Sequence, residues 1–191
     1  MTKWIIIGVV ALLVIMGFSS YNGLVTKEEG VSKAWGNVES DYQRRADLIP
    51  NLVNTVKGYA NFEKETLTQV IQARASATQV KIDANNLTPE NLAAFQQAQG
   101  GLSSALGRLL AVAESYPDLK ANQNFLDLQA QLEGTENRIN VSRQRFNDTV
   151  NEYNVSRRRF PAVIFASILG FKDKGYFKAE AGSEKAPEVK F

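Results

Sequence analysis

An uncharged apolar segment near the start of the chain constrains the fold more than any other feature. Residues 4–18 read WIIIGVVALLVIMGF, and no charged residue occurs between Lys3 and Lys27. A helix needs about 17–25 mostly apolar residues to cross the hydrocarbon core of a bilayer. The segment therefore predicts a membrane-spanning helix, and we assign residues 1–23 to an N-terminal transmembrane anchor.

A cleaved signal peptide is the alternative interpretation of this segment. Lys3 supplies a basic start, and Gly17 and Ser19 are small residues that could precede a cleavage site. The apolar run is long for a signal core, and the uncharged stretch continues through Leu24. We therefore favour a retained anchor.

The composition argues against most catalytic chemistry. The chain contains no Cys and no His, and its net charge is only +2. The most common general base near neutral pH and the most common transition-metal ligand are therefore missing. We expect a protein that is not an enzyme, with no catalytic residues, no metal site and no cofactor. The small net charge also argues against a nucleic-acid partner.

Apolar periodicity and three prolines divide the remaining chain into helices. Four segments carry apolar residues at helical spacing: 24–49, 50–80, 89–115 and 118–160. Pro50 is expected to end the first of them, because the residue before a proline avoids the helical region. Thr88 and Pro89 form a cap and first-turn pair that starts the third. The turns at Pro50 and Pro117 should lie far from the bilayer, and loop 82–89 should lie near it.

The last of these segments has the longest stripe. Its apolar and small residues recur in alternating steps of four and three from Phe125 to Tyr153, as in a coiled-coil seam. The predicted fold is all-α: an N-terminal transmembrane helix that continues into an antiparallel up-down four-helix bundle with long helices. The bundle domain covers residues 24–171, and residues 172–191 are expected to form a flexible C-terminal tail.

A basic cluster followed by an apolar stretch ends the predicted bundle. Three consecutive arginines precede residues 160–171, FPAVIFASILGF, which are too few to span a bilayer. If the chain runs up and down, this stretch returns to the base of the anchor and can lie in the interface. The predicted lipid-surface contacts are Arg157, Arg158, Arg159, Phe160, Ile164 and Phe165. A solvated helix end and an ordinary core segment are the plain alternative.

Several motifs, spread in order along the chain, resemble the LemA family of bacterial membrane-anchored proteins. They are Tyr21-Asn22-x-Leu24-Val25, Ala34-Trp35, RRADLIPNLVNTVKGYA at 44–60, Ala73-Arg74, YPDLKANQNFLDLQAQLEGTENRI at 116–139, Arg143 through Tyr153-Asn154, Pro161 and Gly170-Phe171. The resemblance implies an N-terminal transmembrane helix, an antiparallel helical bundle, a short outward N-terminus and a cytoplasmic body. It implies no activity, and no catalytic residue is carried over.

These observations lead to one functional hypothesis with two alternatives. We expect a single-pass, non-enzymatic module at the bacterial inner membrane, which acts as a scaffold or interaction surface. Its partners would be the lipid bilayer and either an unidentified protein or a second copy of itself. A self-assembling, membrane-remodelling protein is the first alternative, and a ligand-binding bundle is the weaker second.

Overall fold

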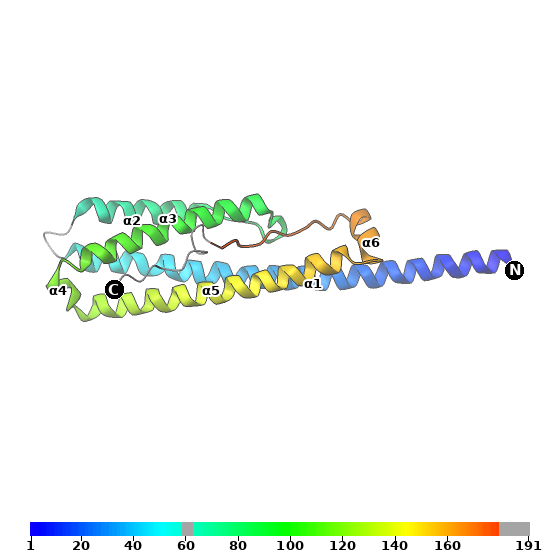
Figure 1. Cartoon of the computed structure of the whole chain (residues 1–191), viewed down its shortest axis with the longest axis horizontal. Helices are drawn as coiled ribbons and strands as arrows, with labels where there is room; N and C mark the ends of the chain where they lie inside the picture. The colour runs from blue at the N-terminus through cyan, green and yellow to red at the C-terminus, as the bar shows by residue number, and fades with distance from the viewer. Residues whose placement is uncertain (59–62, 180–191) are drawn as a thin grey trace, which may run out of the picture.

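The structure is a computed structural model that describes residues 1–58 and 63–179, and within those ranges it contains helices but no strand. Four helices are long: α1 (Thr2–Lys57), α2 (Lys64–Gln79), α3 (Pro89–Ala113) and α5 (Gln123–Arg158). Three are short: η1 (Ala84–Asn86), α4 (Pro117–Lys120) and α6 (Ala162–Ile168). The all-helical prediction is confirmed, and successive long helices run in opposite directions (Figure 1).

Helix α1 joins the apolar segment to the body without a break. It has 56 residues and is about 84 Å long at about 1.5 Å per residue. Its N-terminal part projects beyond all other elements (Figure 1). Among the described residues, α1 alone carries a stretch that is long and apolar enough to cross a membrane, and none of that stretch is buried in the fold. Leu24 is the first buried residue along it.

The prediction that Pro50 ends the first helix is wrong. α1 continues through Pro50 to Lys57, and α2 begins only at Lys64; residues 59–62 of the predicted second helix lie outside the described residues. Proline has no backbone N–H, so the carbonyl of Ala46 loses its usual helical donor. The side chain of Arg74 in α2 supplies a donor instead, with Nε 2.8 Å from that oxygen.

Helices α1 and α5 form a long antiparallel pair, and the other helices pack against this pair (Figure 1). The predicted stripe on the last helix is largely the buried face of α5. That helix is shorter than expected at its start, because α4 ends at Lys120 and a new helix begins at Gln123. The side chain of Asn122 caps α5 by accepting a hydrogen bond from the backbone N–H of Phe125, 3.1 Å away.

Helices α2 and α3 pack against each other and cover the part of the α1–α5 pair that is farthest from the anchor (Figure 1). α2 has 16 residues, about 24 Å, whereas α5 has 36, about 54 Å. We predicted that loop 82–89 lies near the bilayer. The connection between α2 and α3 instead stops short of the C-terminal end of α5. Leu87 is buried in the same cluster as Val31 and Val150, about two turns from the end of the body that lies next to the anchor.

The chain after α6 is packed against the body for at least eight residues. Lys174 and Phe177 are buried although they lie outside any helix. The flexible tail predicted for residues 172–191 is therefore wrong for residues 172–179. Residues 180–191 lie outside the described residues.

Candidate membrane-interface site

Helix α6 packs against the apolar part of α1. The chain turns after α5 at Phe160 and Pro161, and α6 then packs against α1 beside Gly17 (Figure 1). The absence of a side chain at Gly17 allows this approach, since a Cβ there would lie only 3.1 Å from Cε1 of Phe165. A groove between the two helices has an almost wholly apolar lining. The residues that line it are Val10, Leu13, Val14, Gly17, Phe18, Tyr21, Phe165, Ile168 and Leu169.

The outer side of this segment leaves large apolar side chains exposed. Phe160 is 80% exposed and Ile168 is 76% exposed, and Ile164 and Leu169 are each about half exposed. They continue the exposed apolar surface of α1, which extends from Trp4 to Phe18. A contiguous apolar surface of this kind is typical of contact with a membrane or another protein.

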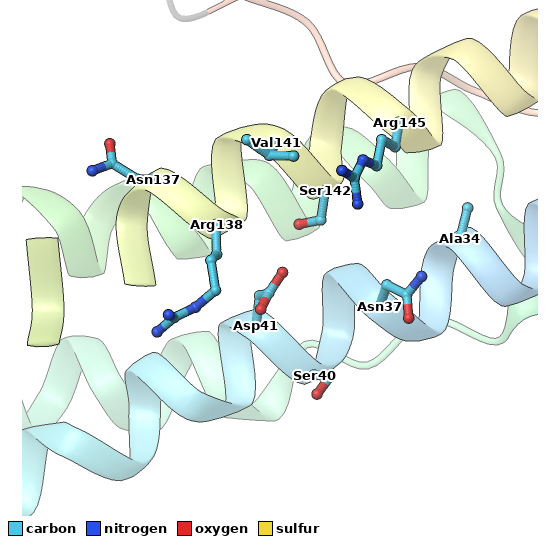
Figure 2. A pocket seen from close by; sticks show the side chains of 9 residues that line it. All are labelled: Ala34, Asn37, Ser40, Asp41, Asn137, Arg138, Val141, Ser142 and Arg145. Carbon is cyan, nitrogen blue, oxygen red and sulfur yellow. The ribbon is translucent and has the colours of Figure 1, made fainter. Parts of the chain in front are cut away.

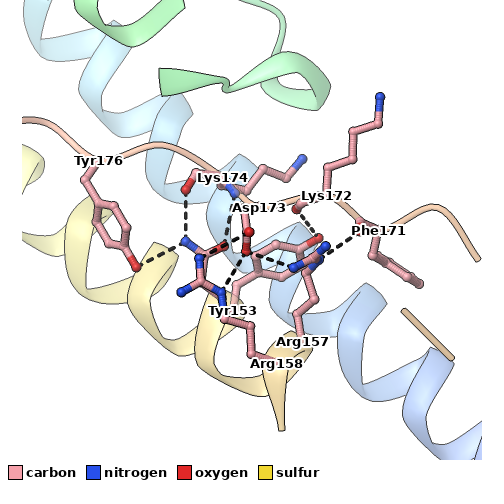
Figure 3. Close-up of polar contacts among 9 residues, drawn as sticks. Tyr153, Arg157, Arg158, Phe171, Lys172, Asp173, Lys174 and Tyr176 are labelled. Atoms are coloured by element: carbon pink, nitrogen blue, oxygen red, sulfur yellow. Dashed lines mark hydrogen bonds and ion pairs between the residues drawn. The ribbon is translucent and has the colours of Figure 1, made fainter. Parts of the chain in front are cut away.

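The arginines beside α6 make contacts with the chain itself. Nε of Arg157 donates to the carbonyl of Phe171 at 2.8 Å, and its Nη1 lies 3.0 Å from a carboxylate oxygen of Asp173. Arg158 pairs with the same carboxylate at 3.2 Å (Figure 3). This hydrogen bond to Asp173 raises the pKa of the Arg158 guanidinium. Arg159 follows at the end of α5 and is exposed.

The six predicted contact residues are thus divided between two surroundings. Arg159, Phe160 and Ile164 are exposed where a bilayer surface would meet the body, given the position of α1. Arg158 is exposed but ion-paired, whereas Arg157 and Phe165 face the protein. Lipid contact by these residues stays a prediction.

A second, polar recess lies between α1 and α5. Asp41 extends from α1 toward Ser142 and Arg138 of α5, and Arg145 lies about one turn of α5 beyond Ser142 (Figure 2). The two guanidinium groups give the recess a cationic side. Among residues 1–58 and 63–179, no group of three or more Asp or Glu residues is arranged to hold a metal ion. The expected absence of a metal or cofactor stays a prediction.

The sequence patterns did not reveal the packed segment of residues 171–178, which we call the strap. It leaves α6 at Gly170, whose φ of +80° suits glycine, and runs in extended form along the groove between α5 and α3. The Tyr153 hydroxyl donates to the carbonyl of Lys172 at 3.0 Å (Figure 3). Burial raises the pKa of Tyr153 from 10.0 to about 12, so this hydroxyl keeps its proton in the folded protein even where an exposed phenol would lose it.

Sequence contained one clue to the strap. Phe171, Tyr176 and Phe177 are aromatic residues in an otherwise polar segment, and a solvated tail has no need of them. Their partners lie on α1, α3 and α5, far away along the chain, so no local pattern connects them.

These features define a class: helical proteins held at a membrane by one long apolar helix, with a short apolar helix folded back against it. The sequence model of the LemA family matches residues 34–191. The chain belongs to the LemA family, and it is a membrane-associated helical protein. The match begins after the apolar segment, so that segment is an observation independent of it.

Three relatives are informative. The magnetosome protein MamQ of Magnetospirillum gryphiswaldense is 28% identical, over 82% of this chain and 64% of its own length. MamQ 1 of Paramagnetospirillum magneticum is 27% identical, over 86% of this chain and 66% of its own. Protein LemA of Metamycoplasma hominis is 26% identical, over 66% of this chain and 54% of its own. The alignments thus span about two thirds or less of each relative's length.

Proposed function

We propose that the protein is a non-enzymatic, single-pass scaffold or protein-interaction module at the bacterial inner membrane. In this proposal the four long helices act as one antiparallel bundle. The body lies in the cytoplasm and the short N-terminus lies outside. The partners are the lipid bilayer and a protein, and no nucleic acid is bound.

The packing of α6 on α1 carries this proposal. Because Phe165 lies against Gly17, the apolar part of α1 is a structural partner of the body. A signal sequence that was removed near Ser19 would take that partner away. The orientation of the anchor also fixes the orientation of the body, because α1 is one continuous helix with no hinge between them. A retained anchor thus supports a body held at a fixed height and angle.

Lipid contact at the base belongs to the same proposal. The exposed apolar residues Phe160, Ile164 and Ile168 would lie in the interface, with Arg159 near the phosphate groups. A basic residue near an anionic surface contributes about 1 kcal/mol. Since Asp173 neutralises only one of the two charges of Arg157 and Arg158, we expect Arg159 and the exposed Arg158 together to supply the positive charge that faces the lipid.

Lipid-depth quenching tests the anchor and α6 in the full chain. The protein has two tryptophans, so Trp35→Phe leaves Trp4 as the single fluorophore and Trp4→Phe leaves Trp35. In vesicles with brominated acyl chains, we expect quenching of Trp4 and little quenching of Trp35. The chain has no Cys, so a fluorescent label can be attached at Ile168→Cys and, as the distal control, at Leu126→Cys. Quenching equal at both labelled sites would contradict the placement of α6.

The interaction role needs a separate measurement. Chemical crosslinking in intact membranes, followed by mass spectrometry, should give reproducible crosslinks from exposed residues of the body to one protein. A flexible insertion between Gly23 and Leu24 uncouples the body from the anchor while keeping both, and it should reduce those crosslinks. Unchanged crosslinks would show that orientation is irrelevant. Turnover of a substrate that is lost on mutation of one carboxylate or Lys would overturn the non-enzymatic proposal.

Self-assembly is a second candidate function, and the strap is the observation that favours it. A segment that binds the body of its own chain is also present on every other copy. Light scattering in detergent distinguishes the candidates, since a strictly monomeric protein argues against assembly.

A further inference from the structure

Three side-chain amides hold the backbone of the strap. Asn154 donates to the carbonyl of Lys174 at 2.9 Å and accepts from its N–H at 3.0 Å. Asn147 makes the same two bonds to Phe177, both 2.9 Å. Gln96 of α3 makes them to Lys178, at 2.7 and 3.2 Å. Each amide thus supplies the pair of bonds that a neighbouring strand would supply, which is how grooves recognise extended peptides.

The groove also selects side chains. The Phe177 ring stacks on Trp35 with ring centroids 6.1 Å apart and meets Phe146 edge-on at 5.4 Å. The guanidinium of Arg143 lies 4.9 Å from the centre of the same ring. This pocket is therefore a closed aromatic site that fits phenylalanine.

Two further positions of the strap are restricted. Nζ of Lys174 lies 2.7 Å from a carboxylate oxygen of Glu28, and its side chain is 5% exposed. Gly175 lies against the backbone of Pro89, where an added Cβ would be only 2.8 Å from the proline nitrogen. The N–H of Gly175 donates to the carbonyl of Leu87 at 2.8 Å. The groove therefore fits an extended segment of the form Lys-Gly-x-Phe.

We propose that this groove is a peptide-recognition site and that its ligand in trans is the strap of a second copy, exchanged reciprocally. A second copy carries the Lys-Gly-x-Phe segment by definition. The three side-chain amides bind backbone groups of the strap, so they would bind the strap of either chain equally well. On its N-terminal side the strap is joined to α6 through the turn at Gly170, so it can leave the groove while the helices keep their packing.

Membrane anchoring makes exchange more favourable than in solution. If α1 spans the bilayer, all copies share one plane and one orientation, and each groove lies at the height of the neighbouring straps. This confinement raises the effective concentration of strap and groove. The inference rests on the anchoring in the proposed function, which lipid quenching of Trp4 tests by itself, so the two can fail separately.

Disulfide crosslinking tests the exchange, at the loss of one of the three amides that hold the strap. One copy carries Gln96→Cys, a second copy carries Lys178→Cys, and the two are reconstituted together in vesicles. The matched control replaces Gln96→Cys by Val141→Cys, an exposed position of α5 that lines the polar recess instead of the groove. We expect a disulfide-linked heterodimer with Gln96→Cys in clear excess over the control. Equal yields, with internal crosslinking when both cysteines lie in one chain, would overturn the proposal.

Peptide binding tests recognition directly. The full-length Phe177→Ala protein in nanodiscs has an empty aromatic pocket, and a fluorescent peptide of residues 170–179, GFKDKGYFKA, should bind it saturably. Peptides with Ala in place of Gly175 or of Phe177 should bind roughly tenfold more weakly or worse. Gly175→Ala, which displaces the strap through Pro89, is the second variant, with circular dichroism as the check of folding.

The combined outcomes are decisive. Peptide binding together with the Gln96–Lys178 heterodimer supports the proposal. A folded Phe177→Ala or Gly175→Ala protein that does not bind the peptide would overturn it. Peptide binding without the heterodimer would overturn exchange between copies and leave the strap as a contact within one chain. If neither variant folds, the crosslinking result decides alone.

Discussion

The bond between Arg74 and the carbonyl of Ala46 should be energetically coupled to Pro50. In an unbroken helix the N–H of residue 50 would donate to that carbonyl, but proline has none. Arg74 of α2 replaces the missing donor, with its Nε 2.8 Å from the oxygen. Ala46 is buried, so water cannot take over this role. We therefore predict that Arg74→Met costs much more stability in the natural chain than in a Pro50→Ala background.

The size of the effect follows from the contacts. A hydrogen bond with a charged group contributes about 1.5–3 kcal/mol, and Arg74→Met removes it while keeping much of the apolar stem. In the Pro50→Ala background the restored N–H of residue 50 satisfies the Ala46 carbonyl, so the loss should fall to about 1 kcal/mol or less. The expected coupling is thus about 1–2 kcal/mol.

Thermal unfolding of the four proteins in detergent, followed by circular dichroism, measures this coupling. For a chain of this size about 1 kcal/mol corresponds to a shift in Tm of roughly 2–4 °C. Arg74→Met should therefore lower Tm by roughly 4–8 °C in the natural chain and by only about half that or less beside Pro50→Ala. Equal losses in both backgrounds would refute the reasoning, because they would show that Arg74 acts independently of the proline.

Three further predictions test other parts of the fold. Gly17→Leu should force α6 away from α1, because even a Cβ would lie 3.1 Å from Phe165, and lipid quenching of a label at Ile168→Cys should change while that at Leu126→Cys does not. The raised pKa of Tyr153 means that the folded state keeps its proton above pH 10, so stability should fall by up to about 3 kcal/mol as pH rises from 10 to about 12, as measured by urea unfolding; Tyr153→Phe should show a smaller decline, because Tyr42, whose pKa burial also raises, remains. Arg45→Met should lower the free energy of unfolding by about 1.5–3 kcal/mol, because it removes the hydrogen bonds of the buried guanidinium to Gln99, Ser103 and Glu136; Arg45→Lys, which lacks the planar fork, should recover little in the same denaturation assay.

Local signals along the chain were sufficient for the anchor and most helices. The apolar segment identifies α1 because length and hydropathy alone decide whether a helix can cross a bilayer. Thr88 and Pro89 mark the start of α3, and the Thr88 hydroxyl caps it 3.2 Å from the N–H of Asn91. The spacing of the stripe from Phe125 to Tyr153 anticipates the buried face of α5, because a helix repeats its face every 3.6 residues.

Other features depend on contacts between residues that are distant in the chain. Pro50 is a helix breaker by local rules, and it lies within α1 because Arg74 satisfies the orphaned carbonyl. A polar tail is a fair prediction for residues 172–179, because an extended segment bound through its backbone has no periodic apolar pattern.

Sequence by itself determined that this chain has a helix long and apolar enough to cross a membrane, a helical body, and neither Cys nor His, because each of these follows from composition or local periodicity. Only the tertiary structure decided that α6 packs on Gly17, that α1 continues past Pro50, and that the strap occupies the groove between α3 and α5. The physical reason is the same in each case. A backbone carbonyl, a missing side chain or an extended backbone acquires its role from the partner that the fold brings to it.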